Sequence, residues 1–374
     1  MLASPRASVL VASLLIAACG GGGGETAGET ATMTTNGSTG EGSGGVDATT
    51  TTGGESTGGT SAGTSSTGEL GSDAILRVTD VTMRCTHNSY HVEPVMPIDD
   101  SHRYTHAPLD VQLEEQGVRA FELDVHSGAG FPVFHIPLGL DDASNCPDLG
   151  ACLGLIDGWS AAHPAHHLIV VWIEMKDELD SGALIKDYDA FDAVIRGALA
   201  ADRLYEPDEF KRGRPTLRAA LEEEGWPTLG ETRGKVMIVL LDDDAPHSAG
   251  YTRDFTSLDG RAMFARANTD HYQDPWAVIA KVNDPADAAG IAAARAAGLL
   301  VASNTGAADL SDDENAAKLA AGIANGSHML CDDFPAPVDG REYWMDLPGG
   351  TPSICNQQGA PPECSPAAVE SLGG

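Results

Sequence analysis

Short apolar runs alternate along the chain with longer Ala-rich stretches whose apolar residues recur at helical spacing. Several runs, such as Leu168–Ile173 and Val236–Leu241, are apolar at every position, which is typical of parallel strands buried on both faces. The strand-like runs are Val81–Cys85, Val118–Val125, Pro132–Phe134, His167–Glu174, Lys235–Leu241, Arg261–Ala265, Gly298–Ala302 and His328–Cys331.

The stretches between these runs predict helices, among them Leu184–Ala200, Asp284–Ala297 and Asp312–Ile323. Ser311 precedes the last of these, and Glu314 follows three residues later, which is the pattern of a capping box. The alternation of eight strand-like runs with helical segments predicts an α/β fold, a TIM-like (β/α)8 barrel.

Two features predict that this barrel is irregular. The run Pro132–Phe134 is very short, and Trp276–Val282 fits either an extra strand or a helix. An open, doubly wound sheet is the structural alternative. No Gly-rich phosphate loop follows the first run, which disfavours a nucleotide-binding sheet of that type.

The first residues predict export. A single early charge, Arg6, precedes the apolar run Val9–Ala18, which is too short to span a bilayer as a mature helix. The run ends in Leu15–Cys19, which resembles a bacterial lipobox. We expect a signal peptide at 1–18, a lipidated Cys19, and a membrane-anchored lipoprotein on the periplasmic or outer cell surface; the alternative is an ordinary signal peptide with a chance cysteine.

Residues 19–72 are mostly Gly, Ser and Thr and have almost nothing to bury, so we expect a disordered tether. The remaining residues, 73–374, have the size of one barrel domain with a C-terminal tail. A formal charge of −33 argues against nucleic acid as a partner. It also disfavours unaided contact with an anionic lipid head group, a conflict that a bound cation would relieve. We expect a monomer.

The chain has seven cysteines, and the even number that follows Cys19 suggests disulfides in an exported protein. The count does not fix the pairing. Short local loops favour Cys146 with Cys152 and Cys355 with Cys364, which leaves Cys85 with Cys331, a pairing that a barrel permits.

Polar residues crowd the carboxyl ends of the predicted strands, where barrel enzymes hold their sites. Glu122 and Asp124 are two residues apart and should project to one face of a strand. Together with Asn88 and Glu174 they would offer four oxygen ligands, which suit Ca²⁺ and, less well, Mg²⁺. The simpler interpretation is that these acids are solvated at exposed strand ends. It would explain any one of the three acids alone, but it explains three acids at neighbouring strand ends less well.

Two histidines stand at the same strand ends. His87 follows the first run and His135 the third, and imidazoles that titrate near neutrality can serve as general base and general acid. A lone histidine at a strand end is more often structural. We expect His91 and His126 to lie close to the site without acting in it.

The motifs in order resemble a known superfamily. They are Thr86–Tyr90, Glu122–Asp124, His135, Ile173–Lys176, Asp332–Pro335, Leu347–Gly350, and Cys355 with Cys364. This set is similar to the phosphoinositide phospholipase C and glycerophosphodiester phosphodiesterase superfamily, and most similar to its bacterial calcium-dependent phospholipases. The resemblance covers roughly residues 80 to 365.

The resemblance implies roles for individual residues. His87 and His135 match the catalytic histidines, and Lys176 matches a basic position near the phosphate. Asn88, Glu122, Asp124 and Glu174 match the calcium ligands. One departure is visible, because Asn304 stands where an arginine is expected, and this puts head-group recognition in doubt.

The hypothesis from sequence is therefore a phosphodiesterase that cleaves the glycerol–phosphate bond of a phosphatidylinositol-like lipid through a cyclic inositol phosphate, with Ca²⁺ assisting acid–base catalysis. One alternative is a glycerophosphodiester phosphodiesterase that acts on deacylated lipids. Another is a non-catalytic binding module displayed at the cell surface. The sequence does not distinguish which histidine is the base and which the acid.

Overall fold

The computed structural model describes residues 69–176, 186–242, 247–349 and 352–370. The predicted signal peptide, Cys19 and the tether up to residue 68 lie outside these residues. The first element, α1 (Glu69–Ile75), already begins within the last residues assigned to the tether, so the folded domain starts before residue 73. Among the described residues, no helix is both long and apolar enough to cross a membrane.

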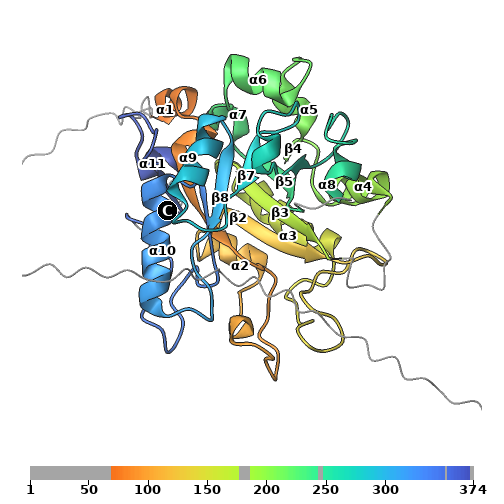
Figure 1. Cartoon of the computed structure of the whole chain (residues 1–374), viewed down its shortest axis with the longest axis vertical. Coiled ribbons are helices and arrows are strands. Elements are labelled where there is room, and N and C mark those ends of the chain that lie inside the picture. The colour runs from red at the N-terminus through yellow and green to blue at the C-terminus, as the bar shows by residue number, and fades with distance from the viewer. Residues whose placement is uncertain (1–68, 177–185, 243–246, 350–351, 371–374) are drawn as a thin grey trace, which may run out of the picture. The chain divides into compact units, whose positions relative to one another are not determined.

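Parallel strands form the centre of the domain (Figure 1). They follow one another around the sheet in the order β6, β5, β3, β2, β1, β9, β8, β7. Their bounds are β1 (Val81–Thr86), β2 (Ala120–Val125), β3 (Ile169–Met175), β5 (Val236–Leu240), β6 (Phe264–Ala265), β7 (Ile279–Lys281), β8 (Leu300–Asn304) and β9 (Met329–Asp332).

The ring closes through a short contact between its two ends. Arg266 and Ile279 form a parallel bridge, and the Ala267 N–H donates to the Ile279 carbonyl at 2.8 Å. The strands β1 and β2 meet at the single pair Cys85 and Ala120. The predicted (β/α)8 barrel is therefore confirmed, with weak seams at β6–β7 and β1–β2.

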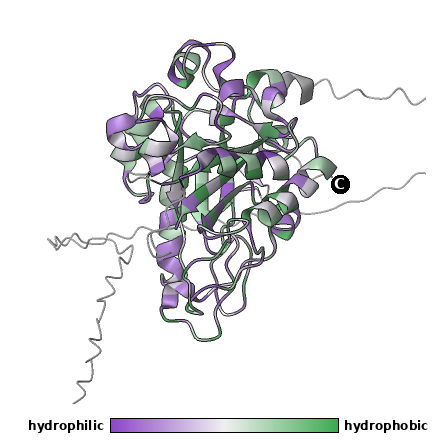
Figure 2. Ribbon diagram, turned by 90° about the vertical axis from the view of Figure 1, so that its right-hand side faces the viewer, coloured by the Kyte–Doolittle hydropathy of each residue, from purple (hydrophilic) through white to green (hydrophobic). Residues whose placement is uncertain are grey.

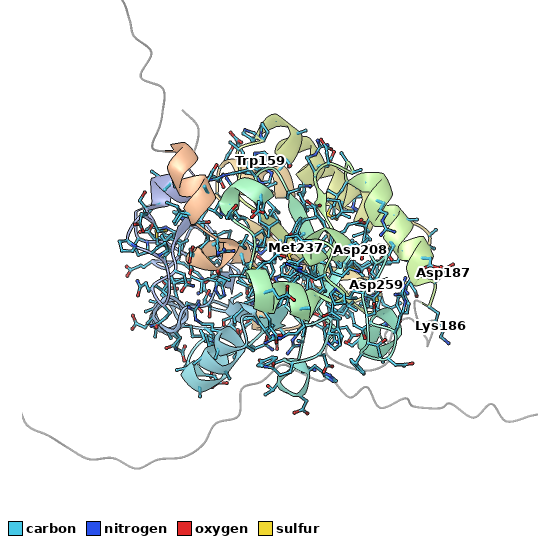
Figure 3. The ribbon with its side chains drawn as sticks, turned by 90° about the horizontal axis from the view of Figure 1, so that it is seen from above. Trp159, Lys186, Asp187, Asp208, Met237 and Asp259 are labelled. Carbon is cyan, nitrogen blue, oxygen red and sulfur yellow. A yellow bond between two sulfur atoms is a disulfide. The ribbon has the colours of Figure 1, made fainter. Side chains whose placement is uncertain are left out.

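Helices surround the ring. They are α2 (Leu109–Glu114), α3 (Leu149–Ala162), α4 (Tyr188–Ala198), α5 (Pro207–Lys211), α6 (Leu217–Glu224), α7 (Leu229–Thr232), α8 (His247–Tyr251), α9 (Ala288–Ala296), α10 (Asp312–Asn325) and α11 (Pro366–Val369). Apolar residues concentrate on the strands, whereas the outer helices carry polar faces (Figure 2). Viewed from above, Met237 of β5 lies near the centre, and Lys186 and Asp187 lie at the edge (Figure 3).

The predicted capping box of α10 is confirmed. The Ser311 N–H donates to Glu314 Oε2 at 2.9 Å, and the Glu314 N–H donates to Ser311 Oγ at 3.3 Å. These bonds satisfy backbone donors that the first helical turn leaves without partners.

Several strand predictions need correction. Pro132–Phe134 is not a barrel strand, because it makes only isolated antiparallel bridges, Pro132 to Asp148 and Val133 to Val125. Proline lacks the N–H that an interior strand must donate. The barrel position goes instead to β7, within Trp276–Val282. The pattern also missed β4 (Leu204–Tyr205), which pairs with β5, and β10 (Ser353–Cys355), which runs antiparallel to β1.

The three expected disulfides are present: Cys85–Cys331, Cys146–Cys152 and Cys355–Cys364. The first joins β1 to β9 at directly paired positions. It therefore links two strands 246 residues apart in the sequence. The residues that follow Cys85 and Cys331 carry much of the polar chemistry described below.

We predict that the double variant Cys85→Ala, Cys331→Ala loses about 2–4 kcal/mol of unfolding free energy, because the crosslink restricts the unfolded chain. The matched variant Cys355→Ala, Cys364→Ala opens a loop with a separation of only 9 residues and should lose less. Urea titrations of both under oxidising conditions measure the difference. Equal losses would contradict the expected effect of loop length.

Candidate active site

The turn after β1 carries His87 and Asn88 at the mouth of the barrel. Asn88 adopts φ 43°, a left-handed conformation that asparagine tolerates better than most residues. The next residue holds this turn in place, because Ser89 Oγ accepts the Glu122 N–H at 2.9 Å. Thr86 Oγ1 lies 2.7 Å from Ser89 Oγ. The position of His87 and Asn88 is thus tied to the strand that carries Glu122.

Three carboxylates meet at the ends of β2 and β3. Glu122 and Asp124 share one face of β2, and Asp124 is the direct register partner of Glu174 on β3. One oxygen from each of the three residues lies within 4.8 Å of the others. We call Glu122, Asp124 and Glu174 the acid cluster; the structure brings together the acids that the sequence singled out.

Two lysines offset the charge of the acid cluster. Lys281 Nζ lies 2.8 Å from Glu122 Oε2, and both side chains are buried. Lys176 Nζ lies 2.6 Å from Glu174 Oε1 and 3.5 Å from Asp124 Oδ2. Lys176 was expected here, but Lys281 was missed because β7, the strand that it ends, is only three residues long.

Burial raises the pKa of Glu122 and of Asp124, whereas nearby positive charges lower it. Burial raises the pKa of Asp124 to about 6, although the charge of Lys176 opposes the rise. Burial also raises the pKa of Glu122, but the charges of Lys281 and then His87 outweigh it and the net pKa is lowered. Asp124 is therefore the acid whose ionised form is least supported by the protein itself.

The donor set fits a calcium ion. Within the described residues, the buried Asp124 carboxylate is held only loosely, with Lys176 Nζ 3.5 Å from Oδ2 and the Tyr90 hydroxyl close to it. The Tyr90 hydroxyl donates to Asn88 Oδ1 at 3.3 Å, and its pKa is raised by burial and then by the charge of Asp124, which places Asn88 beside that acid. A buried and weakly held carboxylate, two further acids and an amide oxygen form a hard-oxygen set, which suits Ca²⁺ rather than Zn²⁺.

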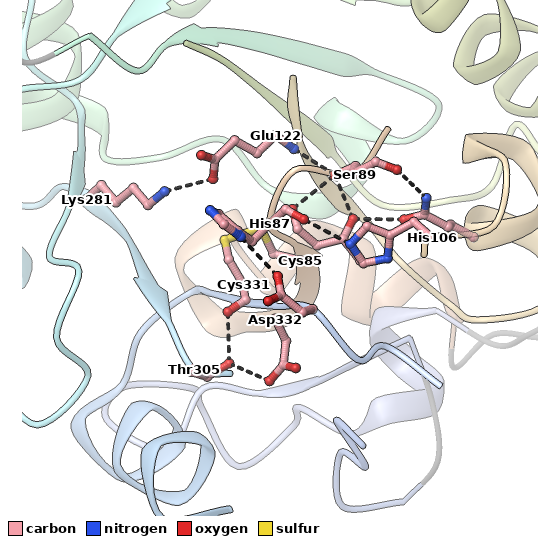
Figure 4. The surroundings of a disulfide bond; sticks show 12 residues. Cys85, His87, Ser89, His106, Glu122, Lys281, Thr305, Cys331 and Asp332 are labelled. Atoms are coloured by element: carbon pink, nitrogen blue, oxygen red, sulfur yellow. Dashed lines mark hydrogen bonds and ion pairs between the residues drawn. A yellow bond between two sulfur atoms is a disulfide. The ribbon is translucent and has the colours of Figure 1, made fainter. Parts of the chain in front are cut away.

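Each of the two candidate catalytic histidines has its own carboxylate. His87 Nδ1 lies 2.9 Å from Asp333 Oδ1, and the His106 ring lies 2.9 Å from the His87 carbonyl. Burial lowers the pKa of His87, but the hydrogen bond and charge of Asp333 and the charge of Glu122 raise it to about 9. Figure 4 shows His87, Glu122 and Lys281 close to the Cys85–Cys331 disulfide.

His135 is oriented by Asp141, which the sequence analysis missed. Its Nδ1 lies 2.7 Å from Asp141 Oδ2, while His91 Nε2 lies 2.8 Å from Asp141 Oδ1. Burial raises the pKa of Asp141, but the hydrogen bonds and charges of these histidines outweigh it and hold the pKa well below its usual range. Because Asp141 engages Nδ1 of His135, proton exchange with a substrate falls to Nε2 of this ring.

The two histidines flank the acid cluster. His87 acts electrostatically on Glu122, and His135 acts on Asp124. Asn304, at the end of β8, has a buried amide oxygen without a partner among the described residues. The arginine expected there is absent, but Arg266, after β6, donates to the Lys281 carbonyl at 3.3 Å and so brings a guanidinium to the end of the neighbouring strand β7.

A barrel mouth that combines an oxygen-lined cation site with two carboxylate-paired imidazoles defines a phosphoric diester hydrolase. The profile of the family described as phosphoinositide phospholipase C, Ca²⁺-dependent, matches residues 127–357. The chain belongs to this family, which uses Ca²⁺. The match contains His135 and Glu174, whereas His87, Asn88, Glu122 and Asp124 precede it.

Solved structures show the same fold. A Ca²⁺-dependent phosphatidylinositol-specific phospholipase C from Streptomyces antibioticus is 21% identical, with a TM-score of 0.51, covering 70% of this chain and 95% of the other. A calcium-dependent phosphoinositol-specific enzyme from Pseudomonas sp. is 18% identical, with a TM-score of 0.54, covering 76% and 96%. The structure of its myoinositol complex is 19% identical, with a TM-score of 0.54, and the match covers 76% of this chain and 97% of the other. No curated protein matches the sequence.

We predict that Asp141→Asn lowers kcat by on the order of 10²–10⁴-fold, because His135 loses the group that fixes its tautomer and orientation. Steady-state kinetics on phosphatidylinositol vesicles measure the effect. Asp274→Asn is the matched control, because it alters a similar pair, His271 Nδ1 and Asp274 Oδ2 at 2.6 Å, outside the site. An Asp141 variant as active as this control would refute the positioning role.

Proposed function

We propose that the protein cleaves the glycerol–phosphate bond of a phosphatidylinositol-like phospholipid and forms diacylglycerol and a cyclic inositol phosphate. The observation that carries this proposal is the acid cluster flanked by His87 and His135, each bonded to a separate carboxylate. Attack by a hydroxyl next to the phosphate requires removal of one proton and delivery of another, which two such groups can provide.

Each residue has a part in this reaction. Asn88, Glu122, Asp124 and Glu174 would hold Ca²⁺, which when bound would supply positive charge that stabilises the negative charge of the reacting phosphodiester. A carboxylate of the acid cluster takes the hydroxyl proton, or His87 does so in its neutral form, which its raised pKa makes the minor form near neutral pH. His135, oriented through Nδ1 by Asp141, delivers a proton from Nε2 to the departing glycerol oxygen.

Lys176 extends its charge toward the phosphate side of the site. Its Nζ is bonded to Glu174 and lies near Asp124. Burial lowers the pKa of Lys176, but the charges of these two acids raise it above its usual value, so the side chain stays cationic. A fixed cation beside the acid cluster adds to the attraction of a phosphodiester group.

Exposed apolar side chains around the mouth favour an intact lipid over a deacylated substrate. Val95, Met96 and Ile98 lie after β1, and Leu138 lies after β2, where 91% of it is exposed. These two loops leave the barrel on the same side (Figure 1). His91 and His135 tie them to one carboxylate, Asp141, so they are held together. Apolar groups displayed in this way gain free energy by entering a lipid surface.

We further propose that the chain is exported as a lipoprotein, anchored through Cys19 to a membrane facing the periplasm or the outside of the cell. The motif at Leu15–Cys19 and the Gly/Ser/Thr-rich segment after it support this proposal. A monomer on such a tether could reach lipids in a nearby bilayer.

Activity on two substrates tests the proposed reaction. We predict Ca²⁺-dependent cleavage of phosphatidylinositol, weak cleavage of glycerophosphoinositol, and a loss of about 10²-fold or more in turnover for His135→Ala. Phosphorus NMR of the products detects the cyclic phosphate. Preference for the deacylated compound would favour a glycerophosphodiester phosphodiesterase instead, and full activity of the His135 variant would remove that residue from the mechanism.

The apolar loops give a separate prediction. The triple variant Val95→Ser, Met96→Ser, Leu138→Ser should lose about tenfold or more activity on vesicles, because each of these side chains contributes about 1.5–3 kcal/mol when fully buried. Activity on a monomeric short-chain lipid should be retained. Ile75→Ser, on α1 at the opposite side of the domain, is the control and should leave vesicle activity unchanged. Equal losses on both substrates would argue against membrane contact.

A further inference from the structure

A second group of ligand-type side chains lies beside the acid cluster and differs from it in chemistry. It consists of His102, His135 and Asp141, each of which offers one ligand atom within 4.8 Å of the others. His102 Nδ1 is 3.3 Å from Asp141 Oδ2, and His135 Nδ1 is 2.7 Å from the same oxygen. Two imidazoles therefore converge on one carboxylate oxygen.

His102 has no part in the proposed reaction, yet its ring is buried. Its side chain is 8% exposed, and Nδ1 has no hydrogen-bond partner within the described residues. An unpartnered buried polar atom costs about 1–3 kcal/mol. The ring also packs edge-on to His135, with centroids 5.2 Å apart. His102 Nδ1 thus faces Asp141 Oδ2 at 3.3 Å without forming a well-aligned hydrogen bond to it.

His91 contacts the other oxygen of the Asp141 carboxylate and holds it in place. Its Nδ1 lies 3.0 Å from the Tyr104 carbonyl oxygen, and its Nε2 lies 2.8 Å from Asp141 Oδ1. Asp141 Oδ1 is therefore occupied, while Oδ2 faces the two other rings. Carboxylates that bind metals are commonly held by such outer hydrogen bonds, which set the direction of the ligating oxygen.

We propose that His102, His135 and Asp141 bind a transition-metal dication, Zn²⁺ in the first instance. Two imidazole nitrogens and one carboxylate oxygen are the protein ligands of many open zinc sites, in which water takes the fourth position. The nitrogen donors favour Zn²⁺ over Ca²⁺, and the all-oxygen acid cluster has the reverse preference. The barrel mouth thus has two cation sites of opposite selectivity.

The distances need only a small adjustment. In a tetrahedral site with bonds of about 2.0–2.1 Å, neighbouring ligand atoms are about 3.3 Å apart. His102 Nδ1 and Asp141 Oδ2 already have a separation of 3.3 Å. His135 Nδ1 must move away from its 2.7 Å hydrogen bond and release its proton to solvent, since only the deprotonated nitrogen ligates.

The consequence is regulation, and this part rests on the proposed function of His135. A metal on His135 Nδ1 replaces the hydrogen bond through which Asp141 orients the ring. Zn²⁺ therefore inhibits the reaction that Ca²⁺ supports, and it does so without displacing Ca²⁺ from the acid cluster.

The test uses the full-length chain without a polyhistidine tag, saturated with Ca²⁺. Zn²⁺ is titrated by calorimetry, Co²⁺ by the visible absorption of its four-coordinate form, and activity on phosphatidylinositol vesicles is measured over the same Zn²⁺ range. His102→Ala and His102→Asn remove the His102 imidazole from the proposed Zn²⁺ site. His271→Ala is the control, because His271 pairs with Asp274 but belongs to no three-ligand group of the described residues.

We expect both His102 variants to weaken Zn²⁺ binding tenfold or more and to keep their Zn²⁺-free turnover, while His271→Ala behaves as wild type. Resistance of the His102 variants to Zn²⁺ inhibition would support the regulatory role. Unchanged Zn²⁺ affinity in these variants, or no binding by wild type, would overturn the site. Because binding is measured without substrate, an enzyme inactive on phosphatidylinositol would refute the proposed function and leave the metal site standing.

Discussion

Repulsion among Glu122, Asp124 and Glu174 is the constraint on which the mouth of the barrel depends. Two unit charges about 5 Å apart repel by roughly 3 kcal/mol at an effective dielectric constant of about 20, and the acid cluster holds three within 4.8 Å. Lys281 and Lys176 reduce this cost, but Lys176 Nζ lies 3.5 Å from the buried Asp124 carboxylate and only 2.6 Å from Glu174, so Asp124 receives the weaker support. A divalent cation bound among these oxygens would relieve the repulsion that the two lysines leave.

The surrounding contacts hold the catalytic groups against this charge. Cys85–Cys331 joins β1 to β9, the two strands followed by His87 and its partner Asp333. On the other side, Asp141 binds His91 and His135 and so connects two loops that leave the barrel separately. The same carboxylate therefore orients a candidate catalytic ring and holds the apolar loops that we propose to contact the membrane. Chemistry and lipid contact depend on one shared residue.

Much of the fold could be predicted because parallel strands buried on both faces leave continuous apolar runs, as in Leu168–Ile173 and Val236–Leu240. The capping box of α10 could also be predicted, since it uses residues three apart. The short strands β4, β7 and β10 could not, because two or three residues carry too little periodicity. The prediction of a barrel strand at Pro132–Phe134 was wrong for a related reason. Its apolar side chains pack within a loop, and the segment makes only isolated bridges.

The residues of the candidate site could likewise be predicted only in part from the sequence. The acids and histidines at strand ends could be found, because each follows an apolar run directly. Lys281, Asp141 and Asp333 act through partners 159, 6 and 246 residues away, and only the folded chain determines such pairs. His102 gave no signal in the sequence, since its role depends on where the loop after β1 meets the loop after β2.

Calorimetric titration of Ca²⁺ into the wild-type chain and into Asp124→Asn tests the central claim most directly. The oxygen-lined site predicts one Ca²⁺ per chain and an affinity at least tenfold weaker in the variant, with Asp274→Asn indistinguishable from wild type. An Asp124→Asn variant that binds Ca²⁺ as tightly as wild type would show that the acid cluster is not the calcium site.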